Sequence, residues 1–118
     1  MRRIGPLLFL LLWAVNPASA RPRAWCGWEM RQLVGSDPGP SYNLARNWAH
    51  WGRGGLPGIG AVVVWPHHVG KIVGQQNGVW VIKSGNDGHA VRTRPRSIAG
   101  AIAIRWDYSP LHGGWGYF

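Results

Sequence analysis

The stretch AVVVWPHHVGKIVG, residues 61–74, holds two apolar runs that are separated by Pro66. The first run, AVVVW over 61–65, has the continuous β-branched character of a buried strand. The second run, HVGKIVG over 68–74, begins at a histidine. Because so few residues separate the runs, we expect them to form neighbouring antiparallel strands of a sheet.

Three further runs continue this pattern toward the C-terminus. They cover residues 78–85, 89–94 and 98–106, and turn residues such as Asn77-Gly78 precede them. Strands at intervals of about ten residues with tight turns are typical of antiparallel sheets. The sequence therefore predicts a five-stranded antiparallel sheet, as a meander or a small open barrel.

Two helical segments precede the predicted strands. Residues 26–34 mix apolar and charged side chains at helical spacing and end at Gly35. Residues 42–51, YNLARNWAHW, follow Ser41 as a capping residue and carry three apolar side chains on one face: Leu44, Trp48 and Trp51. Helices that precede a sheet indicate an α+β domain, with the N-terminal helices packed on the sheet.

The first twenty residues have the composition of a secretory signal peptide. A basic MRR precedes the short apolar run IGPLLFLLLWAV, and Ala18-Ser19-Ala20 has the small-residue pattern of a cleavage site. We expect cleavage after Ala20, a domain over 21–106 and a Gly- and aromatic-rich tail over 107–118. The protein would then be secreted, periplasmic or extracellular in a bacterium, and would meet the membrane only through the cleaved signal peptide.

The charge of the chain indicates an anionic partner. Lys and Arg number 13 against 4 Asp and Glu, which gives a net charge of +9. Anionic lipid, cell-wall polymer and nucleic acid all carry the opposite charge. The basic residues are dispersed rather than clustered on one predicted helix, so we expect no nucleic acid. No nucleotide-binding loop and no metal-ligand spacing occurs in the sequence, so we expect no cofactor and no metal. We also expect a monomer.

Cys26 is the only cysteine in the chain and opens the first predicted helix. A lone exported thiol cannot form an internal disulfide, so it is an intermolecular half-cystine, an inert core residue or a nucleophile. The free N–H groups and the dipole at a helix N-terminus favour thiolate over thiol. From this position we expect a lowered pKa for the Cys26 thiol.

A cysteine nucleophile needs an imidazole base and a polar group that orients the imidazole. His68 begins the second strand, and Asn86 lies just past the third, at the same end of an antiparallel pair. His67 is a direct rival, because alternation lets only one of the two histidines face the helix. If the inner face of the sheet carries Gly70 and Ile72, His68 is the histidine on that face.

The blocks AWCGWEMRQLVG, NLARNWAHWG, PGIGAVVVW, HHVGKIVG and SGNDG follow one another over about residues 24–106. Together and in this order they resemble the NlpC/P60 and CHAP group of papain-like cysteine peptidases and amidases. The resemblance implies a papain-like fold of the NlpC/P60 type. It also implies cleavage of amide bonds in the stem peptides of peptidoglycan, or of another anionic cell-wall substrate.

Carried over by position, Cys26 resembles the family's nucleophile, His68 its base and Asn86 its third residue. Asp87 follows Asn86 and is an alternative orienting group. The acidic residue that the family carries after Pro-Gly is Ile59 here. We expect substrate contacts from residues beside these groups, namely Trp25, Gly27, Trp28, His67 and Asp87.

Two alternatives stay open at this stage. Arg46, Arg92 or Arg94 would steer substrate carboxylates into the site, or they form a solvated face. The whole chain, with its nine tryptophans, would alternatively be a non-catalytic cationic domain. Such a domain would bind anionic cell-wall polymer, lipid or nucleic acid, and Cys26 would then be a buried residue without chemistry.

Overall fold

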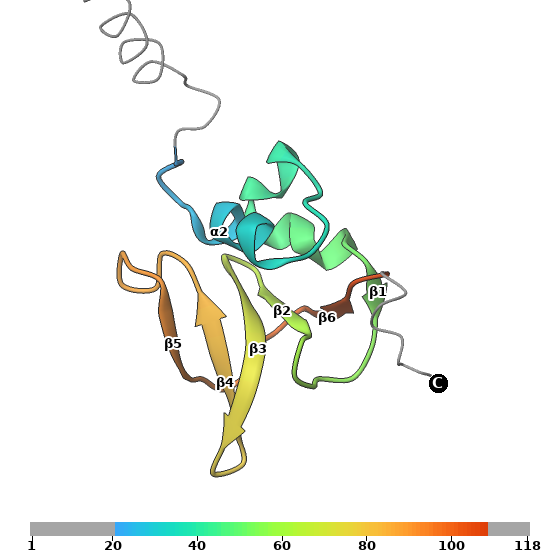
Figure 1. Ribbon diagram of the computed structural model, residues 1–118, viewed down its shortest axis with the longest axis vertical. Helices are drawn as coiled ribbons and strands as arrows, with labels where there is room; N and C mark the ends of the chain where they lie inside the picture. The colour runs from blue at the N-terminus through green and yellow to red at the C-terminus, as the bar shows by residue number, and fades with distance from the viewer. Residues whose placement is uncertain (1–20, 109–118) are drawn as a thin grey trace, which may run out of the picture.

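The computed structural model describes residues 21–108 (Figure 1). The predicted signal peptide over 1–20 and residues 109–118 of the predicted tail lie outside the described residues. Within 21–108, no helix combines the length and the hydropathy that crossing a bilayer requires.

The helical part consists of one α-helix and two short 3-10 segments. The α-helix α2 covers Cys26–Leu33, and the 3-10 segments are η2, Pro40–Asn43, and η3, Ala45–His50. The continuous second helix predicted over 42–51 is wrong, because Leu44 is extended, with φ −82° and ψ 118°. The Trp48 indole N–H donates to the Tyr42 carbonyl at 2.7 Å, which takes an oxygen that a regular helix would use internally.

The sheet is antiparallel throughout and has six strands, in the order β1-β6-β2-β3-β4-β5. This confirms the α+β class, whereas the expected count of five strands is wrong. The additional strand is the two-residue β1, which the glycine-rich segment after η3 forms against β6. The sheet is not a closed barrel. The strands are β1 Arg53–Gly54, β2 Val62–Trp65, β3 His68–Gln76, β4 Val79–Ser84, β5 Arg92–Pro95 and β6 Ala103–Trp106.

The helices cover one face of the sheet at the end where β3 begins and β4 ends (Figure 1). On this helix face, Val62, Val64 and Val69 form a core with side chains of the helical part: Cys26, Met30, Ala45, Trp48 and Trp51. The far face has its own apolar cluster: Ala61, Val63, Trp65, Ile72 and Ile82. Strands β2, β3 and β6 thus alternate between two cores.

This alternation corrects the expected position of the two histidines. Val69 packs in the helix-side core, and the Lys71 ammonium donates to the Leu33 carbonyl at the end of α2, at 3.2 Å. Ile72 packs in the far-face cluster. Gly70 and Ile72 are therefore not on the helix face, and the side chain of His68 does not point toward the helix.

Two glycines allow α2 to lie close to its neighbours. A Cβ on Gly27 would collide with the backbone carbonyls of Tyr42 and Asn43 in η2. A Cβ on Gly85, just after β4, would collide with the side chains of Glu29 and Trp25. The first contact holds η2 against α2, and the second holds α2 against the end of the sheet.

Candidate active site

Cys26, the first residue of α2, contacts the backbone of β3 on both sides of His68. Its thiol donates to the carbonyl of His67 at 3.9 Å. The backbone N–H of Val69 donates in turn to the sulfur. The sulfur therefore lies at the start of β3, beside the peptide groups that precede and follow His68.

An open pocket of about 470 Å³ gives access to this thiol. Cys26 and His67 both line it, although the Cys26 residue as a whole is only 5% exposed. The remaining lining comes from the N-terminal strap, the junction of η2 and η3 and the turn before β3: Pro22, Arg23, Ala24, Asn43, Leu44, Ala45 and Pro66. Cys26 thus lines a pocket that is open to solvent.

Burial raises the pKa of the Cys26 thiol above its ordinary value. The backbone N–H groups of Val69, Gly27 and Cys26 and the positive charge of Arg96 act in the opposite direction, and desolvation outweighs them. The expected lowering of the Cys26 pKa by the helix N-terminus is therefore wrong. The helix start does stabilise the thiolate, but the apolar surroundings disfavour it more.

His68 is half-buried on the far face of the sheet. Its Nε2 atom lies 2.9 Å from the hydroxyl oxygen of Ser84, at the end of β4. Its ring also lies against the indole of Trp65, its register partner on β2, with 5.7 Å between ring centroids. The imidazole is therefore held between two strands by a hydrogen bond and a ring contact.

Ser84 thus has the position that the sequence assigned to Asn86 or Asp87. The reason is that β4 ends at Ser84, and Asn86 then adopts a left-handed backbone with φ 53°. The regular alternation of side chains stops at that point, so Asn86 does not continue the face that carries His68. The signal in the sequence was available, because Ser84 is two residues after the buried Ile82.

The pKa of His68 is lowered to about 4. Desolvation is the main cause, the positive charges of Arg96 and Arg94 also lower it, and the carboxylate of Asp87 raises it. The His68 imidazole is therefore neutral at neutral pH. Since the Cys26 thiol is neutral as well, the resting site holds no thiolate–imidazolium pair.

Asp87 is buried and organises the loop between β4 and β5. Its carboxylate accepts hydrogen bonds from Arg94 Nε at 2.9 Å and from Arg94 Nη2 at 2.5 Å. Its backbone carbonyl accepts from Arg92 Nε at 2.7 Å, and its N–H donates to the Ala90 carbonyl. The two oxygens of this carboxylate are therefore occupied by Arg94 within the loop. The expected substrate contact by Asp87 is not supported.

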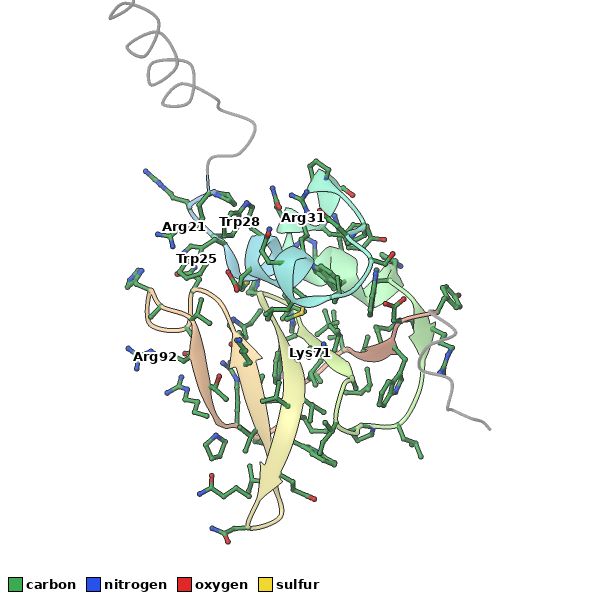
Figure 2. The ribbon with its side chains drawn as sticks, viewed as in Figure 1. Arg21, Trp25, Trp28, Arg31, Lys71 and Arg92 are labelled. Atoms are coloured by element: carbon green, nitrogen blue, oxygen red, sulfur yellow. The ribbon has the colours of Figure 1, made fainter. Side chains whose placement is uncertain are left out.

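Of the other four residues that were expected to contact substrate, two are buried and two are accessible. Trp25 is buried, and the Arg21 guanidinium lies 4.1 Å from its ring centroid (Figure 2). Gly27 is buried, and the carbonyls of η2 occupy the space beside it. Both residues therefore stabilise the start of α2. Trp28 is half-buried and His67 is exposed, so these two remain accessible.

Arg96 belongs to this region and has no place in the sequence prediction. Its guanidinium carbon lies 4.6 Å from the centroid of the Trp65 ring, and Trp65 contacts His68. The alternating arginines of RTRPR, residues 92–96, were the available signal, since alternate residues of a strand share one face.

Within residues 21–108, no three His, Cys, Asp or Glu side chains are close enough together to hold a metal ion. Comparison of the chain with protein-family models, curated proteins and solved structures gives no match. The functional assignment therefore depends on the residues of this site and on the sequence blocks quoted above.

Proposed function

We propose that this protein is a secreted cysteine hydrolase that cleaves amide bonds in peptidoglycan stem peptides. One observation carries the proposal: the sulfur of Cys26 contacts the peptide groups on both sides of His68, and Ser84 holds the Nε2 atom of that histidine. A thiol, an imidazole and a hydroxyl that holds the imidazole then lie at one end of the sheet, the residue types that a cysteine hydrolase requires.

The hydrogen bond to Ser84 assigns different tasks to the two nitrogens of His68. When Nε2 carries the proton and donates to Ser84, the lone pair of Nδ1 is free to accept another proton. Nδ1 is the ring nitrogen nearer the backbone of β3. The orienting group in this proposal is Ser84, and it replaces Asn86.

The chemistry starts from two neutral groups. As the Cys26 sulfur attacks the amide carbonyl, its proton passes to Nδ1 of His68, and the imidazolium then protonates the leaving amine. A thioester remains on Cys26. Neutral His68 next takes a proton from water, which attacks the thioester and restores the thiol. The N–H groups of Val69 and Gly27 stabilise the negative charge on sulfur during both steps.

Charge and shape support the choice of substrate class. Stem peptides carry carboxylates, and the chain after Ala20 has 11 Lys and Arg against 4 Asp and Glu. The open pocket beside Cys26 has the volume of a short peptide segment, and the ordered sequence blocks resemble cell-wall hydrolases.

The test is digestion of purified peptidoglycan under reducing conditions, with the released fragments identified by mass spectrometry. We expect the protein to release new amino groups and Cys26→Ser and His68→Ala to release none. His50→Ala, a change at an exposed histidine on η3, is the matched control and should keep the activity. If the unchanged protein releases nothing, or if Cys26→Ser matches it, the hydrolase assignment is wrong.

The burial of the Cys26 thiol favours one alternative, a non-catalytic domain that binds anionic cell-wall polymer. In that case Cys26→Ala would leave binding to peptidoglycan intact and no fragment would ever be released. Iodoacetamide labelling adds a second measurement. The raised pKa of Cys26 predicts slow alkylation at pH 6 and faster alkylation above pH 9 for either function, so only the digestion separates them.

A further inference from the structure

Three arginines alternate along β5 and the residues that follow it. Arg92 is the register partner of Ser84, and Arg94 is the partner of Ile82. The backbone N–H of Arg96 donates to the carbonyl of Trp80 at 3.0 Å, which continues the pairing beyond the strand. Paired residues of neighbouring strands share a face. All three arginines therefore lie on the far face, which also carries His68.

Two of these arginines already have a partner on Asp87. Arg94 binds the carboxylate of Asp87 through two nitrogens, and Arg92 binds the backbone carbonyl of the same residue. Within residues 21–108, no carboxylate forms an ion pair with Arg96. The guanidinium of Arg96 instead lies over the ring of Trp65.

We propose that Arg96 binds a carboxylate of the substrate and thereby determines specificity for acyl groups that carry a negative charge. This inference rests on the proposed hydrolase function and names the substrate feature that the site selects. A guanidinium that is already stacked on an aromatic ring loses little further conformational freedom when it binds a ligand. Two of its N–H donors match the two oxygens of a carboxylate.

The position of Arg96 fits this task. The Trp65 ring contacts the Arg96 guanidinium at 4.6 Å and the His68 imidazole at 5.7 Å, so one side chain connects the two groups. Beside Arg96, a hollow of about 260 Å³ gives room for the rest of the bound residue. It is lined by Gly78, Val79, Trp80, Arg96, Ser97 and Ile98.

The kinetic test compares two synthetic stem peptides that differ at one group. One carries a free carboxylate beside the scissile bond, and the other carries a carboxamide there. For Arg96→Gln we expect KM for the carboxylate peptide to rise about tenfold or more, with kcat within threefold, and KM for the carboxamide peptide to stay unchanged. Arg96→Lys should lie between Gln and the unchanged protein. An equal loss on both peptides, or no change, would overturn the inference.

Lys83→Gln is the matched control, because it removes one positive charge from β4 on the opposite face of the sheet, beside Thr93. We expect it to leave unchanged the ratio of kcat/KM for the carboxylate peptide to kcat/KM for the carboxamide peptide. Thermal unfolding of each variant shows whether any loss comes from unfolding. A ratio that falls equally in Lys83→Gln and Arg96→Gln means general charge attraction and overturns a specific role for Arg96.

A binding experiment separates this inference from the hydrolase assignment. Calorimetry with the Cys26→Ala protein measures affinity for the two peptides without turnover. A preference for the carboxylate peptide that Arg96→Gln abolishes supports the role of Arg96 even if no hydrolysis is ever detected. Equal affinity of Cys26→Ala for both peptides would overturn the role of Arg96 even if the protein proves to be a hydrolase.

Discussion

The two faces of the sheet consist of alternate residues of the same strands, yet they differ in what covers them. On the helix face, Val62, Val64 and Val69 are fully covered by α2 and η3. At the same end of the far face, the neighbours of these valines include Trp65, His68 and Ser84, and His68 is only half-buried. One face is closed by helices, and the other presents polar groups beside exposed arginines.

The thiol and the imidazole of the proposed site belong to different faces of the sheet. The thiol belongs to the covered face, since Cys26 packs in the helix-side core. The imidazole belongs to the far face. Both groups lie at the end of the sheet where β3 begins, because Cys26 is the first residue of α2 and its thiol donates to the carbonyl of His67.

The largest expected effect compares the two adjacent histidines across this boundary. His68→Ala removes the proposed base, and we expect kcat/KM on peptidoglycan fragments to fall by about 10³-fold or more. His67→Ala removes an exposed side chain whose backbone carbonyl still accepts the thiol, so we expect a loss below about tenfold. Steady-state kinetics of both variants checks this. The reverse order of the two losses would make His67 the base.

The next effect concerns the closed face. Met30 is fully buried between α2 and the sheet, so Met30→Ala leaves a cavity. We expect the free energy of unfolding to fall by about 2–5 kcal/mol, measured by urea titration. Leu56→Ala changes a side chain that is 83% exposed and should cost less than about 0.5 kcal/mol. Equal losses in the two variants would contradict the core described here.

A smaller effect comes from the pH dependence of stability on the open face. Folding lowers the pKa of His68 from 6.5 to about 4, so below pH 6.5 the unfolded chain binds more protons than the folded chain. The unfolding free energy should therefore fall as the pH decreases from 7 to 4.5. We expect a loss of about 2 kcal/mol after an allowance for solvent screening.

The control for this pH effect is His68→Gln, which has no imidazole to titrate. Its unfolding free energy should vary less between pH 7 and pH 4.5 than that of the unchanged protein. Urea titrations at four or five pH values give the two curves. Parallel curves would mean that other groups cause the acid sensitivity.

The smallest effect concerns the hydroxyl that orients the imidazole. Ser84→Ala leaves the Nε2 atom of His68 without its 2.9 Å partner, so we expect kcat to fall about tenfold with KM nearly unchanged. Ser84→Thr keeps a hydroxyl and should recover part of kcat. Ser36→Ala, at an exposed residue after α2, is the control. A tenfold loss in Asn86→Ala but not in Ser84→Ala would restore Asn86 as the orienting residue.

Local features of the sequence were sufficient to predict the α-helix and the main strands. The helix over 26–34 and the runs at 61–65, 68–74 and 78–85 correspond to α2, β2, β3 and β4. Their periodicity and turn residues depend on neighbours within a few positions, so no tertiary information is needed. The strand β1 was missed because two residues, Arg53 and Gly54, carry no periodicity, and they form a strand only because β6 lies beside them.

For the site, the sequence alone determined which residue types are present and which strand ends they occupy: a thiol at a helix start, histidines at the start of β3 and polar residues at the end of β4. Only the tertiary structure decided that Ser84 holds His68, that Asp87 binds Arg94, and that both the thiol and the imidazole are neutral. The physical reason is that the face on which a side chain lies, its burial and the charges around it depend on long-range packing. The main contacts are those of α2 with Gly85 and of Trp65 with His68. Spacing along the chain does not contain that information.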